Sequence, residues 1–250
     1  MERWHNKVAI VTGASAGIGV AIVKDLIKFN IKVIGLARRV HKIEEIRNEI
    51  PENLHKNNLF AKKCDVSKES EVIQVFNEII NEHGSIDILI NNAGYMESGD
   101  LSMMNTQSIR DVLNTNVMGI VYCTQQAFKN MKTRNFNGHV ILINSIAGHR
   151  ITAPVDNSPS INIYSPSKYA VTAMTEVYRQ EFSDLGTKCK ITSISPGLTN
   201  TAMLPEEWKK FEDVGYLNPE DISNCVMFAL STPSHVQIFE LTVLPVGKRI

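Results

Sequence analysis

Net charge, cysteine and long hydrophobic runs are all scarce in this sequence. Twenty-six basic residues balance 26 acidic ones, so no overall field draws the chain to nucleic acid or to an anionic membrane surface. No apolar stretch reaches the ~18 residues that a membrane-spanning helix needs. We therefore expect a protein that neither binds nucleic acid nor crosses a membrane.

Only four cysteines occur, and none belongs to a Cys-x-x-Cys pair or stands at metal-ligand spacing from a histidine. They are Cys64, Cys123, Cys189 and Cys225, each in or beside an apolar run, where a free thiol packs as a small hydrophobic group. The seven histidines also lack paired spacing with acidic residues or cysteine, so no metal site is predicted. The first apolar run begins within a few residues of Met1 and leaves no room for a signal peptide. These absences favour a reducing compartment, the cytoplasm.

What the chain does contain is a regular alternation of apolar runs and helical patterns across 250 residues. Several runs are continuously apolar, as strands buried on both faces of a parallel sheet are. The predicted strands span residues 7–13, 31–37, 59–66, 86–94, 139–145, 189–197 and 239–244. The alternation predicts one α/β domain over residues 1–250, with a doubly wound, mainly parallel, seven-stranded Rossmann-type sheet and helices on both faces.

Two predicted helices have clear ends. Residues 41–50 place Ile43, Ile46 and Ile50 at helical spacing, and the pattern stops at Pro51. Residues 68–84 place apolar side chains along one side and end at Gly84, because glycine is the usual residue just past a helix C-terminus.

Three glycines lie between the first predicted strand and the first predicted helix, in the segment VTGASAGIG (11–19). Gly13, Gly17 and Gly19 would let the backbone turn tightly and approach a pyrophosphate, and the helix N-terminus would supply N–H donors. The spacing is G-x-x-x-G-x-G and differs from the G-x-G-x-x-G form. A dinucleotide site is the favoured interpretation, and a tight turn without a ligand is the alternative.

The end of the second predicted strand indicates which dinucleotide would bind. An NAD site carries an acidic residue there for the ribose 2′-hydroxyl, whereas this chain has Arg38 and Arg39. A guanidinium group binds phosphate through paired hydrogen bonds, so the pattern favours NADP(H), unless both arginines only face solvent. Asp65, near the end of the third predicted strand, would accept from the adenine amino group or would cap a helix beginning near Ser67.

Tyr164 and Lys168 stand four positions apart in a segment of helical character. Residues at i and i+4 share one helix face, and a nearby ammonium group lowers a phenol pKa that is normally ~10. Such a phenol exchanges a proton with a reacting oxygen near neutral pH. The alternative is a pair of amphipathic side chains on a solvated helix face.

Six short segments occur in the order and spacing of one family. They are TGASAGIG (12–19), NNAG (91–94), NTNVMG (114–119), INSIAG (143–148), YSPSK (164–168) and SPG (195–197). The whole chain therefore resembles the short-chain dehydrogenases/reductases. Its first 19 residues, INSIAGHR (143–150) and the tail FALSTPSHVQIFELTVLPV (228–246) are similar to the branch of insect farnesol dehydrogenase-like proteins and vertebrate dehydrogenase/reductase member 11.

The resemblance implies four catalytic roles. Tyr164 would be the general acid/base, and Lys168 would lower its pKa and hold the nicotinamide ribose. Ser145 would hold the substrate oxygen, and Asn116 would bind a water that links Lys168 to solvent. Together these roles imply an oxidoreductase that interconverts an alcohol and a carbonyl group.

The cofactor positions follow from the same motifs. Those implied by the resemblance, together with those argued above, are Thr12, Gly13, Ser15, Ile18, Gly19, Arg38, Arg39, Asp65, Asn92, Ala93, Gly94, Pro196, Gly197, Leu198 and Thr201. One position departs from the pattern, because many NADP-using relatives carry a basic residue where this chain has Ala16. The NADP(H) prediction therefore depends on Arg38, with Arg39 and Ser15 as helpers.

Residues 1–140 are expected to form mainly the cofactor half, and residues 141–250 the catalytic and substrate half. The irregular loops 149–163 and 198–219 follow strands and so belong to the rim where ligands bind. Candidate substrate contacts are Met96, Ile146, His149, Leu198, Met203, Trp208 and Tyr216. This mostly apolar set suits a farnesol- or farnesal-like substrate. The alternatives are ordinary loop packing, a structural role for His149, and packing anchors at Trp4 and Trp208.

Two other functions are compatible with the sequence. A hydroxysteroid or ecdysteroid-type carbonyl reductase would use the same catalytic groups, and only a substrate panel separates it from the first hypothesis. A non-catalytic dinucleotide-binding scaffold is a different class, and the complete catalytic set argues against it.

The resemblance also implies a homodimer or homotetramer, because relatives associate through the helices that contain Asn116 and Tyr164. Apolar residues on these helices would form the contact or would face the sheet. They include Val117, Ile120, Val171 and Val177.

Overall fold

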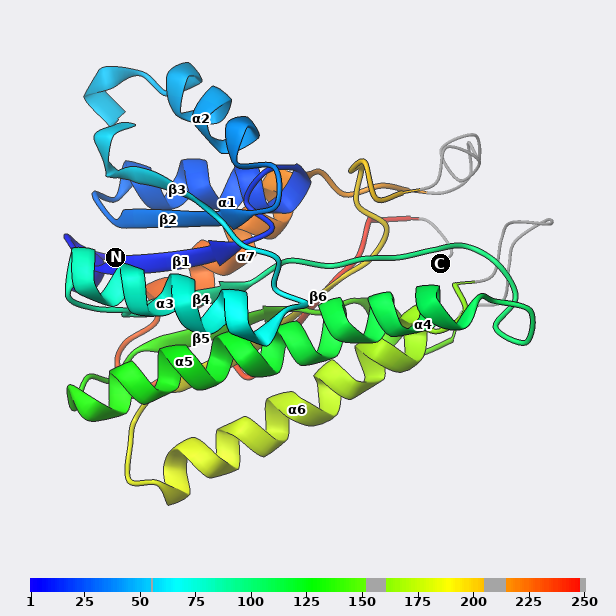
Figure 1. The fold of residues 1–250 in the computed structure, drawn as a ribbon. Coiled ribbons are helices and arrows are strands. Elements are labelled where there is room, and N and C mark those ends of the chain that lie inside the picture. Colours follow the sequence, from blue (N-terminus) through cyan, green and yellow to red (C-terminus); the bar gives the residue numbers. More distant parts are fainter. Residues whose placement is uncertain (55, 152–160, 205–214, 248–250) are drawn as a thin grey trace.

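The computed structural model describes residues 1–54, 56–151, 161–204 and 215–247 (Figure 1). Seven parallel strands form one sheet in the order β3-β2-β1-β4-β5-β6-β7. The strands are β1 (Val8–Thr12), β2 (Lys32–Ala37), β3 (Leu59–Lys63), β4 (Ile88–Asn91), β5 (His139–Ile143), β6 (Lys190–Pro196) and β7 (Glu240–Val243). The strand order reverses between β1 and β4, which is where open α/β sheets bind ligands. The predicted doubly wound parallel sheet is confirmed.

Helices cover both faces of this sheet (Figure 1). One face carries α1 (Gly17–Lys28), α2 (Val40–Glu49) and α7 (Pro219–Ser231). The other face carries α3 (Glu69–His83), α5 (Gly119–Thr133) and α6 (Tyr164–Asp184). The remaining described helices are α4 (Thr106–Leu113), the π-helical turn η4 (Asn114–Met118), and the 3₁₀ turns η1 (Glu2–Trp4), η2 (Glu52–Leu54), η3 (Lys56–Asn58) and η5 (Ile146–Gly148).

The continuously apolar strands supply two hydrophobic cores at once. In β1, Ala9 and Val11 pack toward α1, α2 and α7, while Val8 and Ile10 pack toward α3, α5 and α6. Successive strand side chains point to opposite faces of a sheet, and each buried aliphatic side chain contributes about 1.5–3 kcal/mol. Trp4 is buried in the first core, which confirms its predicted role as a packing anchor.

The segment between β3 and α3 corrects one predicted boundary. β3 ends at Lys63, and α3 begins at Glu69 rather than near Ser67. The carboxylate of Asp65 accepts hydrogen bonds from the N–H of Ser67 (3.1 Å) and from its hydroxyl (2.7 Å), so it closes a turn before the helix and does not cap it. Gly84 follows α3 with a φ of 78°, as predicted. The other strands are also shorter than predicted, because the apolar segments include residues that flank the strands at one or both ends.

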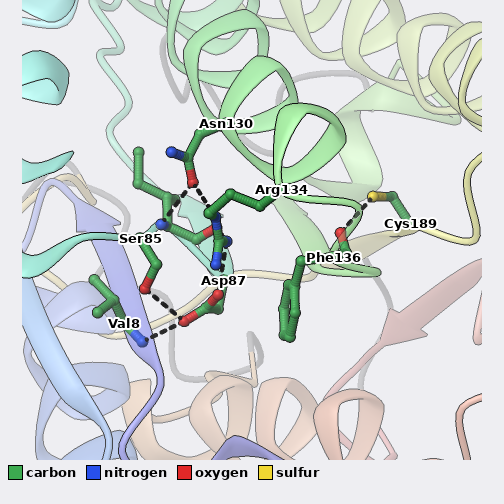
Figure 2. A network of polar contacts seen from close by, with 8 residues as sticks. Val8, Ser85, Asp87, Asn130, Arg134, Phe136 and Cys189 are labelled. Atoms are coloured by element: carbon green, nitrogen blue, oxygen red, sulfur yellow. Dashed lines mark hydrogen bonds and ion pairs between the residues drawn. The ribbon is translucent and has the colours of Figure 1, made fainter.

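An ion pair with a buried carboxylate joins segments at the edge of the sheet where the strands begin (Figure 2). Asp87 accepts from the N–H of Val8 (2.9 Å) and from the hydroxyl of Ser85 (3.0 Å). Arg134, just after α5, donates to the Asp87 carboxylate at 2.7 Å. The segment before β4 is thereby joined to β1 and to the end of α5.

Candidate active site

The carboxyl ends of β1, β4, β5 and β6 lie at one edge of the sheet, the edge at which α1 and α6 begin (Figure 1). Thr12 ends β1, Asn92 directly follows β4, Ser145 comes two residues after β5, and Pro196 ends β6. Parallel strands necessarily bring their carboxyl ends together. The predicted catalytic and cofactor residues, which are spread over most of the sequence, therefore gather at this edge.

The glycine segment forms a tight turn that opens α1. Gly13 and Gly17 have φ angles of 66° and 53°, a region in which residues with a Cβ atom are strained. A Cβ atom on Gly13 would lie 2.9 Å from Cα of Ala93. Helix α1 begins at Gly17 without a side-chain cap and without an acidic residue in its first turn. Its first N–H groups are therefore suited to an anion.

Thr12 and Asn92 join the glycine turn to the end of β4. The hydroxyl of Thr12 accepts from the N–H groups of Asn92 and Ala93, both at 2.9 Å. The side-chain amide of Asn92 donates to the carbonyls of Thr12 (2.9 Å) and Gly13 (3.3 Å). These bonds cross about 80 positions of sequence, so they fix two predicted cofactor segments relative to each other.

The segment after β6 lies against the same turn. The N–H of Gly197 donates to the carbonyl of Val243 at 2.8 Å, and Leu198 accepts from the N–H of Leu217 at 2.8 Å. Further along, a Cβ atom on Gly17 would lie 2.9 Å from Cγ2 of Thr201. The structure thus brings Thr201 next to the glycine turn.

Arg38 and Arg39 directly follow β2 and are exposed. Within the described ranges, neither guanidinium group has an ion-pair or hydrogen-bond partner. Both groups are therefore available to an anionic ligand near the carboxyl end of β2. The contact between Asp65 and an adenine amino group stays a prediction.

Tyr164 is the first residue of α6, and Lys168 lies one turn further along. The Lys168 side chain is buried, its Nζ lies 5.7 Å from the centroid of the Tyr164 ring, and it donates to the carbonyl of Ile143 at 2.8 Å. The predicted helical pair is present, and Lys168 does not lie on a solvated face.

The pKa of Tyr164 differs from the sequence prediction. Burial raises this pKa to about 12, and the nearby Ser145 hydroxyl acts in the opposite direction. Burial also lowers the pKa of Lys168 to about 8. The predicted lowering of the phenol pKa by Lys168 is therefore wrong for the protein by itself, because desolvation of the phenolate dominates. The phenol is protonated at neutral pH.

Ser145 belongs to a turn rather than to the end of a strand. It is the N-cap of η5, and its hydroxyl accepts from the N–H of Ala147 at 3.1 Å. The turn packs closely on α6, because a Cβ atom on Gly148 would lie 2.6 Å from the carbonyl oxygen of Lys168. Thr172 adds a hydrogen bond to the carbonyl of Gly148 at 2.9 Å. The contribution of Thr172 has no local signal in the sequence.

Asn116 lies in the π-helical turn η4 between α4 and α5, a type of turn that is common at functional sites. Its Oδ1 accepts from the N–H of Tyr95 (2.8 Å), and its Nδ2 donates to the carbonyl of Tyr95 (2.9 Å) and to the hydroxyl of Ser167 (3.1 Å). Sequence reasoning missed Tyr95 and Ser167. The water between Asn116 and Lys168 stays a prediction.

The candidate substrate residues have different environments. Met96 and Tyr216 are half-buried, Ile146 is buried, and Met203 is partly exposed. A Cβ atom on Gly94 would lie 3.4 Å from Cε of Met203, so Met203 reaches the segment after β4. Trp208 lies outside the described residues.

His149 has partners within the protein. Its Nε2 lies 2.6 Å from a carboxylate oxygen of Glu240 and 2.9 Å from the hydroxyl of Ser195. These contacts connect the end of η5 to β6 and β7. They agree with the alternative that His149 has a structural role. Its contact with substrate stays a prediction.

Two other features, a metal site and a membrane-spanning helix, are absent from the described ranges. Within them, no three His, Cys, Asp or Glu side chains are grouped so that they could hold a metal ion. None of the helices in these ranges is both long enough and apolar enough to cross a bilayer.

The fold and the site together indicate a class of protein, the α/β oxidoreductases that bind a dinucleotide at the carboxyl edge of a parallel sheet. Residues 7–212 match the short chain dehydrogenase family. The chain therefore belongs to this family of oxidoreductases.

Individual relatives agree with this assignment. The chain is 47% identical to farnesol dehydrogenase of Aedes aegypti over 252 residues, with 100% of both chains covered. It is 39% identical to dehydrogenase/reductase SDR family member 11 of Homo sapiens over 254 residues, which covers 98% of this chain and 96% of that protein. The family and the branch predicted from the sequence are confirmed.

Solved structures share the fold along nearly the whole chain. The closed form of serine dehydrogenase complexed with NADP+ has a TM-score of 0.85 and 29% identity, with 97% of this chain and 96% of that chain covered. Alcohol dehydrogenase from the archaeon Thermococcus sibiricus complexed with 5-hydroxy-NADP has a TM-score of 0.83 and 25% identity, with 98% of each chain covered.

Proposed function

We propose that this protein is an NADP(H)-dependent dehydrogenase/reductase that interconverts an alcohol and a carbonyl group on an apolar, farnesol- or farnesal-like substrate. Tyr164 is the general acid/base in this proposal. The observation that carries it is the meeting of Tyr164, Lys168 and Ser145 at the sheet edge that also holds the glycine turn.

The residues present fit NADP(H). The uncapped N-terminus of α1 suits a pyrophosphate, and the exposed guanidinium group of Arg38 suits a 2′-phosphate. Thr201, which lies against Gly17, belongs to the segment that would lie along the nicotinamide. NADP(H), when bound, supplies or accepts the hydride. Two structural relatives were solved with NADP+ or 5-hydroxy-NADP, which supports this choice of cofactor.

Side chains of the protein donate the proton to the substrate oxygen or remove it. Carbonyl reduction needs a proton donor, and Tyr164 is protonated at neutral pH because burial raises its pKa to about 12. The Ser145 hydroxyl, which acts to lower the pKa of Tyr164, can donate to the developing alkoxide. The Lys168 ammonium, 5.7 Å from the ring centroid, stabilises the phenolate that remains after proton transfer. Alcohol oxidation uses the same groups in reverse.

The substrate class rests on two supports. The candidate rim residues Met96, Ile146 and Met203 are apolar, as the walls of ligand pockets usually are. The relative at 47% identity is a farnesol dehydrogenase. A panel of farnesal, farnesol, steroid ketones and small aromatic aldehydes, assayed with NADPH or NADP+, tests this choice directly. Turnover of steroids without turnover of farnesol or farnesal would overturn it.

The substitution Tyr164→Phe tests the catalytic role. It removes the hydroxyl and keeps the ring, so we expect kcat to fall by at least about 10³-fold while NADPH binding, followed by its fluorescence, is retained. Tyr169→Phe is a matched control, because Tyr169 lies on the same helix and is 42% exposed. Full activity of the Tyr164→Phe protein would rule out the mechanism.

We further propose a homodimer or homotetramer formed through α5 and α6. Ile120 and Val171 are buried in the hydrophobic core. They therefore face the sheet and are not available for a contact between subunits. Val177 is 50% exposed on α6 and is available for association. Val177→Asp should lower the mass measured by sedimentation equilibrium, and an unchanged mass would contradict this interface.

The proposed location is the cytoplasm. All four cysteines are free thiols, which suits a reducing compartment. Fractionation of cells that express the tagged full-length chain tests this, and recovery with the membrane or secreted fraction would overturn it.

A further inference from the structure

Tyr164 lies at the start of a helix, where the helix alone does little to fix the orientation of a side chain. Tyr164 is the first residue of α6, and its N–H donates to the carbonyl of Ile161 at 2.9 Å, which is a three-residue turn outside the regular helical pattern. First turns of helices have unsatisfied backbone groups and fray easily. A side chain that must meet a reacting oxygen needs additional restraint there.

Asn162 provides one such restraint. It is buried, lies two residues before Tyr164, and has a φ of 36°. Its Nδ2 donates to the carbonyl oxygen of Glu97 at 2.6 Å. The start of α6 is thereby tied to the segment that follows β4, which is 65 positions away in the sequence.

The other side of Tyr164 is tied to the same segment through Asn116. The Ser167 hydroxyl donates to the carbonyl of Tyr164 at 2.6 Å and accepts from Nδ2 of Asn116 at 3.1 Å. Asn116 binds both backbone groups of Tyr95. The Tyr95 hydroxyl donates to a carboxylate oxygen of Glu97 at 3.0 Å, which stiffens the segment between them.

These contacts form a closed circuit. It runs from Tyr164 through Ser167 and Asn116 to Tyr95, then along the chain to Glu97, across to Asn162, and back along the chain to Tyr164. Its members are Tyr95, Glu97, Asn116, Asn162, Tyr164 and Ser167. Because the circuit holds the backbone on both sides of Tyr164, a change at any one link would let the first turn of α6 move.

We propose that Asn162 is a positioning residue for Tyr164, and that its hydrogen bond to Glu97 keeps the phenol within reach of Ser145 and the substrate oxygen. This rests on the proposed role of Tyr164 as the general acid/base. Asparagine suits the position for two reasons. It adopts the left-handed backbone region more readily than most residues, and its side-chain amide supplies the N–H donor that the Glu97 carbonyl accepts.

The substitution Asn162→Gly separates these two properties, because glycine accepts the left-handed backbone and lacks the amide donor. The matched control is Asn135→Gly, since Asn135 has a φ of 50°, is exposed and follows α5 at the opposite edge of the sheet. We expect kcat to fall by about 5-fold to about 100-fold in Asn162→Gly. NADPH affinity, and kcat in the control, should stay within about two-fold of the wild-type values.

Two further readouts separate positioning from general loss of structure. NADPH titration counts the folded binding sites, so kcat is expressed per site even where Asn162→Gly lowers the unfolding temperature. A looser Tyr164 also moves away from the Ser145 hydroxyl, which acts to lower its pKa. The pH midpoint of alcohol oxidation, which needs the phenolate, should therefore move upward in Asn162→Gly and stay unchanged in Asn135→Gly.

A double-mutant cycle with Ser167→Ala completes the test. Both substitutions open the same circuit, so their combined loss of kcat should be smaller than the product of the single losses. Unchanged kcat per site in Asn162→Gly, an unmoved pH midpoint, or fully multiplicative losses would each overturn the proposal. Retained activity in Tyr164→Phe would instead overturn the proposed function, so the two failures are distinguishable.

Discussion

Lys168 on α6 donates a 2.8 Å hydrogen bond to the backbone carbonyl of Ile143, the last residue of β5. The bond joins the helix that begins with Tyr164 to the strand from which the Ser145 turn departs. Lys168 is only 5% exposed, and a neutral carbonyl replaces its hydration shell incompletely. This burial is why the pKa of Lys168 falls to about 8, and it makes the stability of the protein depend on pH.

The sign of that dependence follows from proton binding. The unfolded chain keeps the Lys168 proton up to its ordinary pKa of 10.5, whereas the folded protein releases it near pH 8. Folded protein binds fewer protons in this window, so the wild type gains about 3 kcal/mol of stability relative to Lys168→Met as the pH rises from about 8 to about 10.5. Urea unfolding of both proteins at the two ends of the window measures the gain. A stability difference that is the same at both pH values would contradict it.

Cofactor preference should change when the charge after β2 is reversed. Arg38→Asp removes a charge-assisted contact with the 2′-phosphate and adds repulsion, so the ratio of kcat/KM for NADPH to that for NADH should fall by about 10-fold to 100-fold. Arg47→Asp on α2 is the matched control, because the Arg47 side chain is 41% exposed and paired only with Glu44 among the described residues. An unchanged ratio in Arg38→Asp would refute the assignment of the 2′-phosphate site.

Loss of Arg134 should destabilise the fold without changing the chemistry. Asp87 is 1% exposed. Among the described residues, Arg134→Met would leave the Asp87 carboxylate with only the N–H of Val8 and the hydroxyl of Ser85 as partners (Figure 2). Breaking a buried ion pair from one side costs about 3–5 kcal/mol. Urea unfolding should show a loss near the lower limit, because Arg134 is partly exposed.

Arg179→Met is the matched control for this prediction. Arg179 pairs with Glu176 on the exposed surface of α6, and exposed pairs contribute less than about 1 kcal/mol. The ion pair of Asp87 lies at the amino-terminal edge of the sheet, so kcat per folded site should be unchanged in Arg134→Met. Equal losses of stability in the two variants would show that the buried pair is no stronger than a surface pair.

The fold was largely predictable because its signals are local. Ile43 and Ile46 at helical spacing predicted α2, and both are buried. Gly84 predicted the end of α3 and adopts the left-handed conformation there. The ends of the strands were less predictable, since Asp65 lies within a predicted strand segment but closes a turn through its hydrogen bonds to Ser67.

The candidate site was predictable where a motif names a residue and not where a contact joins distant segments. Tyr164, Lys168, Ser145 and Asn116 are identified by spacing, whereas the support that Asn162 gives through Glu97 has no local pattern. The pKa of Tyr164 also could not be predicted from the sequence. Proximity to Lys168 at i+4 predicted a lowered pKa, but burial depends on everything that packs around the ring and has the opposite effect.

By itself, the sequence determined the order of the strands and helices, the glycine turn and the chemical types of the catalytic groups, because hydrophobic period and turn chemistry act over a few residues. Only the tertiary structure decided which distant residues meet at the carboxyl edge, how far each titratable group is removed from water, and how the first turn of α6 is held. These properties depend on contacts between segments tens of residues apart, and desolvation and hydrogen-bond geometry are set only when those segments pack.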